Sequence, residues 1–343
     1  MLAFLTSQNI WVASLFGLLA MALLVLSADL AVKKLIGLAA YFKLSTTFMG
    51  MTVFSLATSI PEITAHLTAS VGILRGTLDY EVSSAIVLGA NIGSDVIQQT
   101  LIMGIVVFMA GNLYFRRYFL FKSLGPMIGT TLMCIILGWD RVYSRLDGFV
   151  LFGTFLIYTY YLYVDERKHF RVEDNRPEAE AEIGVPQTGL EAMRDALIAV
   201  GAWVVTVLSA QVVLTITERV VATTGLGGSF IGVITLGVAS ALPELTTAIS
   251  GIGNKEHGIS LGTLVGSNIT NPLVAIGGGA LVSTYYVPGP LVLWDLPWET
   301  ITGAVLWVIL WFSKGRLGRL GAIYLMGLYV VYIAFRAIFF SID

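Results

Sequence analysis

The sequence predicts an all-α integral membrane protein with ten transmembrane helices, arranged as two inverted five-helix repeats. Three observations predict this fold class. The composition is too apolar for a soluble globule, the apolar residues fall into ten long stretches, and one motif occurs once in each half. Of the 343 residues, 56% are hydrophobic and 12% are charged, and the mean hydropathy is +0.83. Lipid must therefore form part of the solvent around this chain.

Charge and cysteine content exclude several classes of protein. The net charge of −2 provides no basic field for binding nucleic acid. The single cysteine, Cys134, excludes a disulfide within the chain and a cysteine metal cluster. The first apolar run lacks a basic start and a small-residue cleavage site, and it is long enough to cross a bilayer. We therefore expect a first transmembrane helix there rather than a signal peptide.

The apolar stretches give the expected order of the helices. A helix that crosses a bilayer needs about 20 mostly apolar residues. Ten stretches meet this requirement, at 8–31, 45–71, 81–109, 118–138, 146–164, 191–216, 228–253, 258–284, 297–313 and 318–340. The polar segment 165–190 is expected to be a cytoplasmic linker between a first repeat, 1–164, and a second repeat, 191–343.

The basic residues predict the orientation in the membrane. Of the 20 lysines and arginines, 15 fall in or beside the loops after the first, third, fifth, seventh and ninth stretches. Basic residues are enriched in cytoplasmic loops. We therefore expect both termini to lie outside the cytoplasm, in a protein of the plasma membrane.

Two matched motifs indicate an internal duplication. The segment from Gly50 to Glu62 aligns without a gap on the segment from Gly232 to Glu244, and both end in Pro-Glu. Further on, residues 88–95 match residues 261–268. The duplicated blocks cover 50–104 and 232–280. Because each half holds an odd number of spans, the second copy must enter the membrane from the opposite side.

The duplicated Pro-Glu pairs predict a cation site in the membrane. Pro61 and Pro243 cannot bond the carbonyls four residues earlier, so each should break its helix and free backbone oxygens near Thr58 and Ser240. Such a break is tolerated at membrane depth only around a cavity. Each proline precedes a carboxylate, Glu62 or Glu244, that is costly to insert and is therefore expected to be functional. We list the pairing residue once more for clarity: Pro61 with Glu62, Pro243 with Glu244.

Oxygen ligands of this kind fit calcium. Two bidentate carboxylates and two carbonyls would supply six oxygens, and Ca²⁺ takes about 6 to 8. Magnesium fits less well because it dehydrates reluctantly, and the spans hold no Cys/His pair for zinc or copper. Asp95 and Asn268 follow matched Gly-Ser pairs and are expected to face the site. His66 is open to a ligand or proton-carrier role, although helix packing is favoured, and Asp29 is expected to pair with Lys33.

At these motifs the chain resembles the cation/calcium exchanger superfamily, and most of all its prokaryotic sodium/calcium exchangers. The resemblance implies that Glu62 and Glu244 bind Ca²⁺ with the carbonyls of Thr58 and Ser240, beside Asp95 and Asn268. It also implies that the first and sixth spans slide past a core of the second, third, seventh and eighth. The sodium ligands it implies fall at Ser59, Ala241, Ser55, Gly237, Asn91 and Leu264.

The second half departs from the family pattern, which leaves the counter-ion open. Ala241 and Leu264 lack the oxygens found at these positions in the family. The expected function is an antiporter that exchanges Ca²⁺ for Na⁺ by alternating access, with a proton/calcium exchanger as the alternative and a passive cation channel less favoured. Three acids exceed the charge of one Ca²⁺, so Asp95 is expected to stay protonated. No enzymatic activity and no cofactor are expected, and a monomer is compatible with this interpretation.

Overall fold

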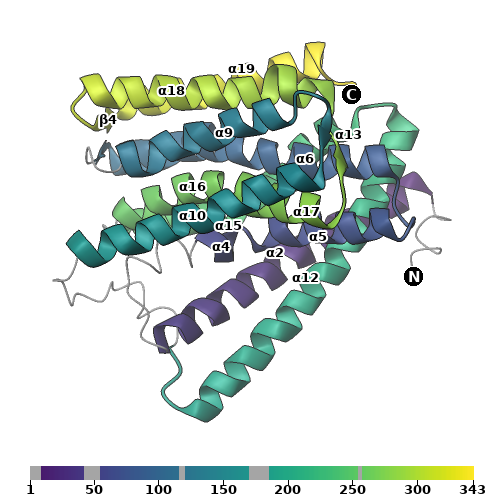
Figure 1. Ribbon diagram of the computed structural model, residues 1–343, viewed down its shortest axis with the longest axis horizontal. Coiled ribbons are helices and arrows are strands. Elements are labelled where there is room, and N and C mark those ends of the chain that lie inside the picture. Colours follow the sequence, from purple (N-terminus) through teal and green to yellow (C-terminus); the bar gives the residue numbers. More distant parts are fainter. Residues whose placement is uncertain (1–8, 42–54, 116–119, 170–184, 254–256) are drawn as a thin grey trace.

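The computed structural model is helical along almost the whole of its described part, which comprises residues 9–41, 55–115, 120–169, 185–253 and 257–343 (Figure 1). The first half forms α2 (Ile10–Tyr41), α4 (Ser55–Thr58), α5 (Ile60–Leu74), α6 (Tyr80–Ile97), η2 (Gln98–Ile102), α7 (Met103–Ala110), β1 (Asn112–Tyr114), η3 (Leu120–Leu124), α9 (Gly125–Leu137), β2 (Val142–Tyr143) and α10 (Arg145–His169). The elements labelled η are π-helical turns that continue the neighbouring α-helices.

The second half repeats this order. It forms α12 (Gly189–Thr224), α13 (Gly228–Gly232), η4 (Val233–Gly237), α14 (Val238–Ser240), α15 (Leu242–Gly253), α16 (His257–Thr270), η5 (Asn271–Ile276), α17 (Gly277–Val282), β3 (Tyr285–Tyr286), η6 (Leu291–Asp295), α18 (Leu296–Phe312), β4 (Arg316–Gly318) and α19 (Arg319–Phe339).

Eight helical segments of the described chain are long and apolar enough to cross a membrane. They correspond to eight of the ten expected spans. The expected second span begins in residues outside the described part and continues as α4 and the short apolar helix α5. The expected eighth span is present as α16, η5 and α17, but its Gly, Asn and Thr residues dilute its hydropathy. The expected linker at 165–190 starts later than predicted, because α10 continues to His169.

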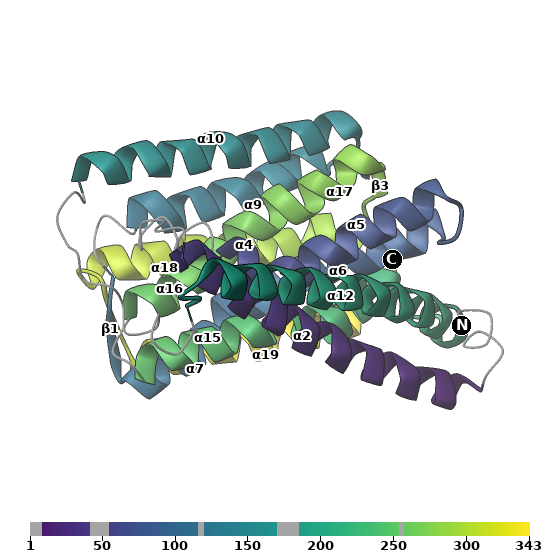
Figure 2. The same ribbon diagram turned by 90° about the horizontal axis from the view of Figure 1, so that it is seen from below.

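The two longest helices, α2 and α12, lie side by side along one flank of the molecule (Figures 1 and 2). Their contact includes polar pairs within the apolar surface. Ser27 and Thr206 hydroxyls lie 2.9 Å apart, and Lys34 Nζ lies 3.0 Å from Asp195 Oδ1. On α2 the expected pair of Asp29 and Lys33 is also formed, at 2.8 Å.

Two short strand pairs tie the halves together. β1 pairs with β4, and β2 pairs with β3, both antiparallel. The two pairs lie at opposite ends of the molecule: β1 and β4 at one end, β3 at the other (Figures 1 and 2). Each pair joins a strand of the first half to a strand of the second, so both ends of the helical bundle are closed by contacts between the halves.

The π-helical turns recur at matched places. η2 begins three residues after Asp95, and η5 begins three residues after Asn268. The duplicated block therefore carries the same local distortion twice. A π-helical turn widens the helix by one residue and is common at functional sites.

Close contact between α6 and the segment from α13 to η4 depends on glycine. A Cβ added at Gly89 would lie 2.2 Å from the carbonyl oxygen of Ser229, and one at Gly232 would lie 2.2 Å from that of Ile86. The backbones therefore touch where no side chain fits. Gly262, which matches Gly89 in the repeat, has nothing within 4 Å of such a Cβ.

This contrast gives a matched pair of substitutions. Gly89→Ala should destabilise the protein by about 1–3 kcal/mol because its methyl group overpacks the contact with Ser229. Gly262→Ala should be neutral or stabilising by up to about 1 kcal/mol, because alanine favours the helix and meets no neighbour. Unfolding in detergent measures both, and an equal loss in the two variants would contradict the packing argument.

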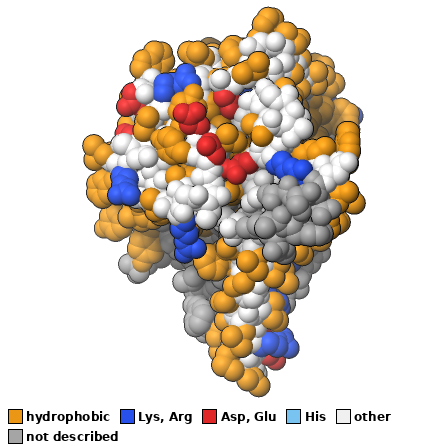
Figure 3. All heavy atoms as spheres, turned by 90° about the vertical axis from the view of Figure 1, so that its right-hand side faces the viewer, with side chains coloured by type: hydrophobic (Ala, Val, Ile, Leu, Met, Phe, Trp, Pro, Cys, Tyr) orange, Lys and Arg blue, Asp and Glu red, His pale blue; other side chains and the backbone are white. Residues whose placement is uncertain are grey.

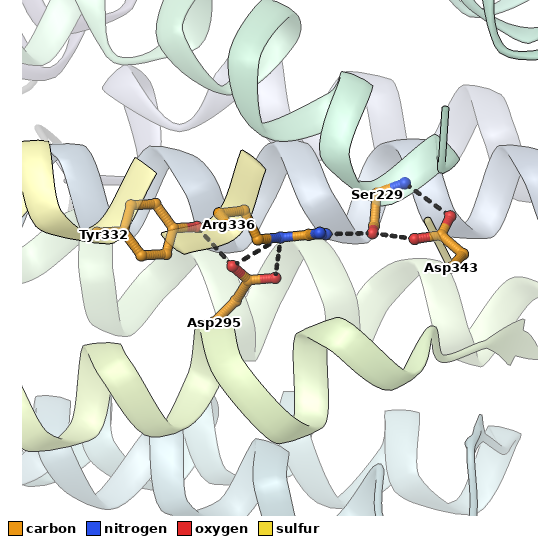
Figure 4. A network of polar contacts seen from close by, with 5 residues as sticks. All are labelled: Ser229, Asp295, Tyr332, Arg336 and Asp343. Carbon is orange, nitrogen blue, oxygen red and sulfur yellow. Dashed lines mark hydrogen bonds and ion pairs between the residues drawn. The ribbon is translucent and has the colours of Figure 1, made fainter. Parts of the chain in front are cut away.

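A buried charge network fixes the start of α13 to the C-terminal helix (Figure 4). Arg336 Nε donates to both carboxylate oxygens of Asp295, at 3.1 and 3.0 Å, and Tyr332 donates to the same carboxylate at 2.7 Å. Arg336 Nη2 also donates to Ser229 Oγ at 2.5 Å, and Ser229 N donates to Asp343 at 2.9 Å. The charges of Arg336 and Asp295 are fully buried and compensate each other.

Asp295→Asn should destabilise the protein strongly, by about 3–5 kcal/mol, because it leaves the Arg336 charge without its counter-charge. Tyr332→Phe removes only one hydrogen bond of the network and should cost about 0.5–1.5 kcal/mol. Chemical unfolding of the purified protein compares the two, and a smaller effect of Asp295→Asn than of Tyr332→Phe would show that the ion pair is not the anchor.

Candidate cation site

Both predicted helix breaks are present. The first lies at Ser59, between α4 and α5, and the second at Ala241, between α14 and α15. Each break lies two residues before Pro61 or Pro243, as expected from a proline that cannot bond the preceding turn. The break starts a new helix just before each glutamate, so that Glu62 and Glu244 both lie in the first turn of a helix.

Glu62 is buried, with 4% of its surface exposed. Its Oε1 accepts a hydrogen bond from Ser94 Oγ at 3.0 Å, whereas Oε2 has no donor within the described residues. The hydroxyl of Ser240, from the second block, also lies near this carboxylate. A side chain of the first block is therefore held between residues of both halves.

Glu244 is fully buried, and neither of its carboxylate oxygens has a hydrogen-bond donor at bonding distance in the part of the chain described. The hydroxyl of Thr58, from the first block, lies near this carboxylate, as Ser240 lies near Glu62. The two carboxylates are close enough for their charges to interact. The structure thus brings the predicted pair together, with each acid facing the hydroxyl residue of the other block.

A chain of amide and hydroxyl groups links Glu62 to α16. Gln98 Nε2 donates to Ser94 Oγ at 2.9 Å, and Ser267 Oγ donates to Gln98 Oε1. Ser94 and Ser267 are matched positions of the duplication, so Gln98 bridges the two blocks. We expected the Gly-Ser pairs to serve close packing, and their hydroxyls prove to be part of the polar network.

Asp95 and Asn268 are in contact, as predicted. Asn268 Nδ2 donates to the backbone carbonyl of Asp95 at 3.1 Å. The Asp95 carboxylate is held by Asn271, whose Nδ2 lies 2.7 Å from Oδ1. Asn91 joins the group through a 3.4 Å contact from its Nδ2 to the Asn271 carbonyl. All four side chains are at most 1% exposed.

Sequence reasoning missed Gln98 and Asn271. They occupy the same position in the two blocks, three residues after Asp95 and Asn268, and both start a π-helical turn. Extending the repeat comparison by one turn would have found them. The side chain of Ser55 lies outside the described part, and Ser59 Oγ is buried without a hydrogen-bond partner. Gly237 and Leu264 supply no side-chain oxygen; Gly237 packs against the Ala90 carbonyl.

His66 lies one turn after Glu62 and contacts the loop strand β3. Its Nδ1 lies 3.2 Å from the hydroxyl of Tyr285, which also lies 2.5 Å from Ser70 Oγ. The contact joins α5 to the segment after α17, as the favoured packing role requires. Its Nε2 has no hydrogen-bond partner within the described residues.

The site has an excess of hydrogen-bond acceptors. Within the described residues, the buried side-chain oxygens without a donor are Glu62 Oε2, Glu244 Oε1 and Oε2, Asn91 Oδ1, Asn268 Oδ1 and Asn271 Oδ1. Buried polar atoms are normally paired. The same part of the chain has no group of three or more His, Cys, Asp or Glu side chains arranged to hold a metal ion. The arrangement therefore suits a hard cation that accepts mixed carboxylate, amide and carbonyl ligands.

Comparison with known proteins agrees with this chemistry. Residues 12–164 and 195–338 match the family model described as sodium/calcium exchanger protein. The chain belongs to the sodium/calcium exchanger family. This is a family of transporters and not of enzymes, and the present exchanger is accordingly an integral membrane cation exchanger.

Individual relatives cover most of this exchanger. It is 26% identical over 282 residues to the "Putative antiporter CaxA" of Alkalimonas amylolytica, which covers 79% of this chain and 81% of the relative. It is 24% identical over 314 residues to the inner membrane protein YrbG of Escherichia coli strain K12, which covers 91% and 93%.

Solved structures share its fold. The H⁺/Ca²⁺ exchanger CAX superposes with a TM-score of 0.77 at 16% identity, covering 97% of this chain and 84% of that one. The sodium-calcium exchanger NCX_Mj, soaked with 10 mM Na⁺ and zero Ca²⁺, superposes with a TM-score of 0.61 at 20% identity, covering 95% and 99%. The exchanger therefore has the all-α membrane fold of these transporters.

Asn271→Ala should weaken divalent-cation binding by about 10- to 100-fold, because a hydrogen bond to an ionised group contributes about 1.5–3 kcal/mol. Asn112→Ala, in β1, is the control and should leave binding unchanged, because Asn112 lies outside the network. Titration calorimetry of the purified exchanger measures both, and unchanged binding by Asn271→Ala would remove Asn271 from the site.

Proposed function

We propose that this exchanger is a secondary antiporter that moves Ca²⁺ in one direction and Na⁺ in the other by alternating access. The observation that carries the proposal is the pair of buried carboxylates, Glu62 and Glu244, with three oxygens that lack a hydrogen-bond donor within the described residues. Membership of the sodium/calcium exchanger family supports the same cargo.

In this proposal Ca²⁺ binds between Glu62 and Glu244. The backbone carbonyls of Thr58 and Ser240, at the last residue before each helix break, are candidate further ligands. Asp95, oriented by Asn271, lies beside them with Asn268. Ca²⁺ and the counter-ion compete for the same acids, and this competition couples their movements in opposite directions.

We propose two inverted five-helix repeats with both termini outside the cytoplasm of a plasma-membrane protein. The matched helix breaks and π-helical turns support the repeat, and the two strand pairs at opposite ends support its inversion. The start of α2 and the C-terminus lie at one end of the molecule (Figure 1). Acidic side chains gather near the middle of that end (Figure 3), where basic residues are expected to be few.

The same arrangement suggests which parts move. The α2/α12 pair lies on the flank of the bundle, outside the helices that carry the acids (Figures 1 and 2). Sliding of this pair past α5, α6, α15 and α16 would open the site to each side in turn. A single chain contains both blocks of the site, so we propose that a monomer is sufficient.

A proton/calcium exchanger is the second candidate. Ala241 and Leu264 provide no side-chain oxygen where the family pattern has one, which weakens the case for a full set of sodium ligands. The fold similarity to the H⁺/Ca²⁺ exchanger CAX is compatible with this alternative, although it concerns the fold alone.

Calcium uptake into proteoliposomes separates these possibilities. An outward Na⁺ gradient should drive ⁴⁵Ca²⁺ uptake, a pH gradient alone should not, and Glu62→Gln or Glu244→Gln should abolish the driven uptake because each removes a charged ligand. Glu81→Gln, an exposed acid at the start of α6, is the control and should retain it. Uptake driven only by the pH gradient would establish the proton exchanger, whereas uptake without any counter-ion would indicate a channel.

A further inference from the structure

A third set of polar contacts surrounds Glu299, an acid outside the duplicated blocks. Glu299 lies in the first turn of α18 and is 2% exposed. Its Oε1 accepts a hydrogen bond of 3.0 Å from Thr131 Oγ1 on α9, and the same hydroxyl is shared with the carbonyl of Met127. Among the described residues, no Lys, Arg or His forms an ion pair with Glu299.

Asp295, one turn earlier on the same helical segment, shows what a compensated acid looks like here. Its carboxylate has a buried arginine and a tyrosine hydroxyl as partners (Figure 4). Glu299 has one shared hydroxyl and no cation. A carboxylate buried without a counter-charge costs several kcal/mol, and such a group normally takes up a proton instead.

Gln99 connects Glu299 to the cation site. It lies one helical turn after Asp95, and its Nε2 donates to the Glu299 carbonyl at 2.9 Å and to Thr302 Oγ1 at 2.7 Å. Its own Oε1 is buried without a donor in the part of the chain described. Glu299 makes no printed hydrogen bond to a candidate ligand, yet its charge and that of Asp95 interact across this turn.

The titratable groups that face Glu299 leave its charge uncompensated. They are Asp95 on α6, Cys134 on α9, Tyr143 on β2 and Asp295 on η6. Each of these is neutral or negative. The cation of this region, Arg336, is bound to Asp295. A positive charge entering beside Asp95 would therefore be the main influence able to stabilise the ionised form of Glu299.

We propose that Glu299 is a proton-binding site of the transport cycle, which holds a proton while the central site lacks a divalent cation and releases it to water when Ca²⁺ binds. The O–H bond of the Glu299 carboxyl breaks, its electron pair stays on the carboxylate, and the charge of Ca²⁺ compensates the new anion. This inference rests on the proposed function, because it takes Ca²⁺ as the cargo.

Counting protons during Ca²⁺ binding tests the proposal. Titration calorimetry of the purified full-length exchanger at one pH, in two buffers with different heats of ionisation, gives the number of protons released per Ca²⁺. Glu299→Gln keeps an acceptor for Thr131 and should release about one proton fewer than the wild type. Glu218→Gln, a half-buried acid of α12 that contacts Asp79 rather than the central site, should release the wild-type number.

The outcomes separate the two levels of the proposal. If the wild type binds no Ca²⁺, the proposed function fails. If the wild type binds Ca²⁺ and Glu299→Gln releases as many protons as the wild type, the role of Glu299 fails alone.

A second variant covers the case in which Glu299→Gln does not fold. Thr131→Val removes the hydroxyl that stabilises the ionised carboxylate, so Glu299 should retain its proton to a higher pH, and the plot of protons released against pH should shift upward in pH. An unshifted plot would overturn the proposal.

Discussion

A carboxylate that is removed from water needs a positive charge or a proton, and this requirement governs the centre of the exchanger. Glu62 and Glu244 are both buried, and three of their four oxygens have no hydrogen-bond donor within the described residues. A soluble protein would place such acids at its surface. Here they are retained in the interior of a membrane protein, where a cation can act as their partner and where the partner changes during transport.

The duplication supplies the geometry that this requirement needs. Each copy of the block breaks its helix before a glutamate and distorts its second helix after Asp95 or Asn268. Because the blocks face each other, the hydroxyl of one lies near the acid of the other. One local sequence, used twice, thereby encloses a site from two sides, and neither copy could do so alone. The glycine contacts between α6 and α13 hold the copies at backbone distance.

The same helical segment shows two solutions to buried charge. Asp295 is neutralised by Arg336 in a network that anchors α13 and the C-terminal helix, and such a pair is fixed. Glu299, one turn later, has no such pair among the described residues. A fixed pair serves stability, because its charges balance in every state. An acid without a fixed partner can change its charge state, and so it can respond to the occupancy of the neighbouring site.

The sequence by itself determined the membrane class, the helix breaks at Pro61 and Pro243, and the candidate acids, because hydropathy, proline and costly intramembrane charge act locally or by composition. It also indicated the contact of Asp95 with Asn268 through the duplication. Only the tertiary structure revealed Gln98 and Asn271 as partners of the site, the ion pair of Asp295 with Arg336, and the isolation of Glu299. These features depend on which side chains meet across helices far apart in the chain, and a hydrogen bond between distant residues leaves no periodic trace in one sequence.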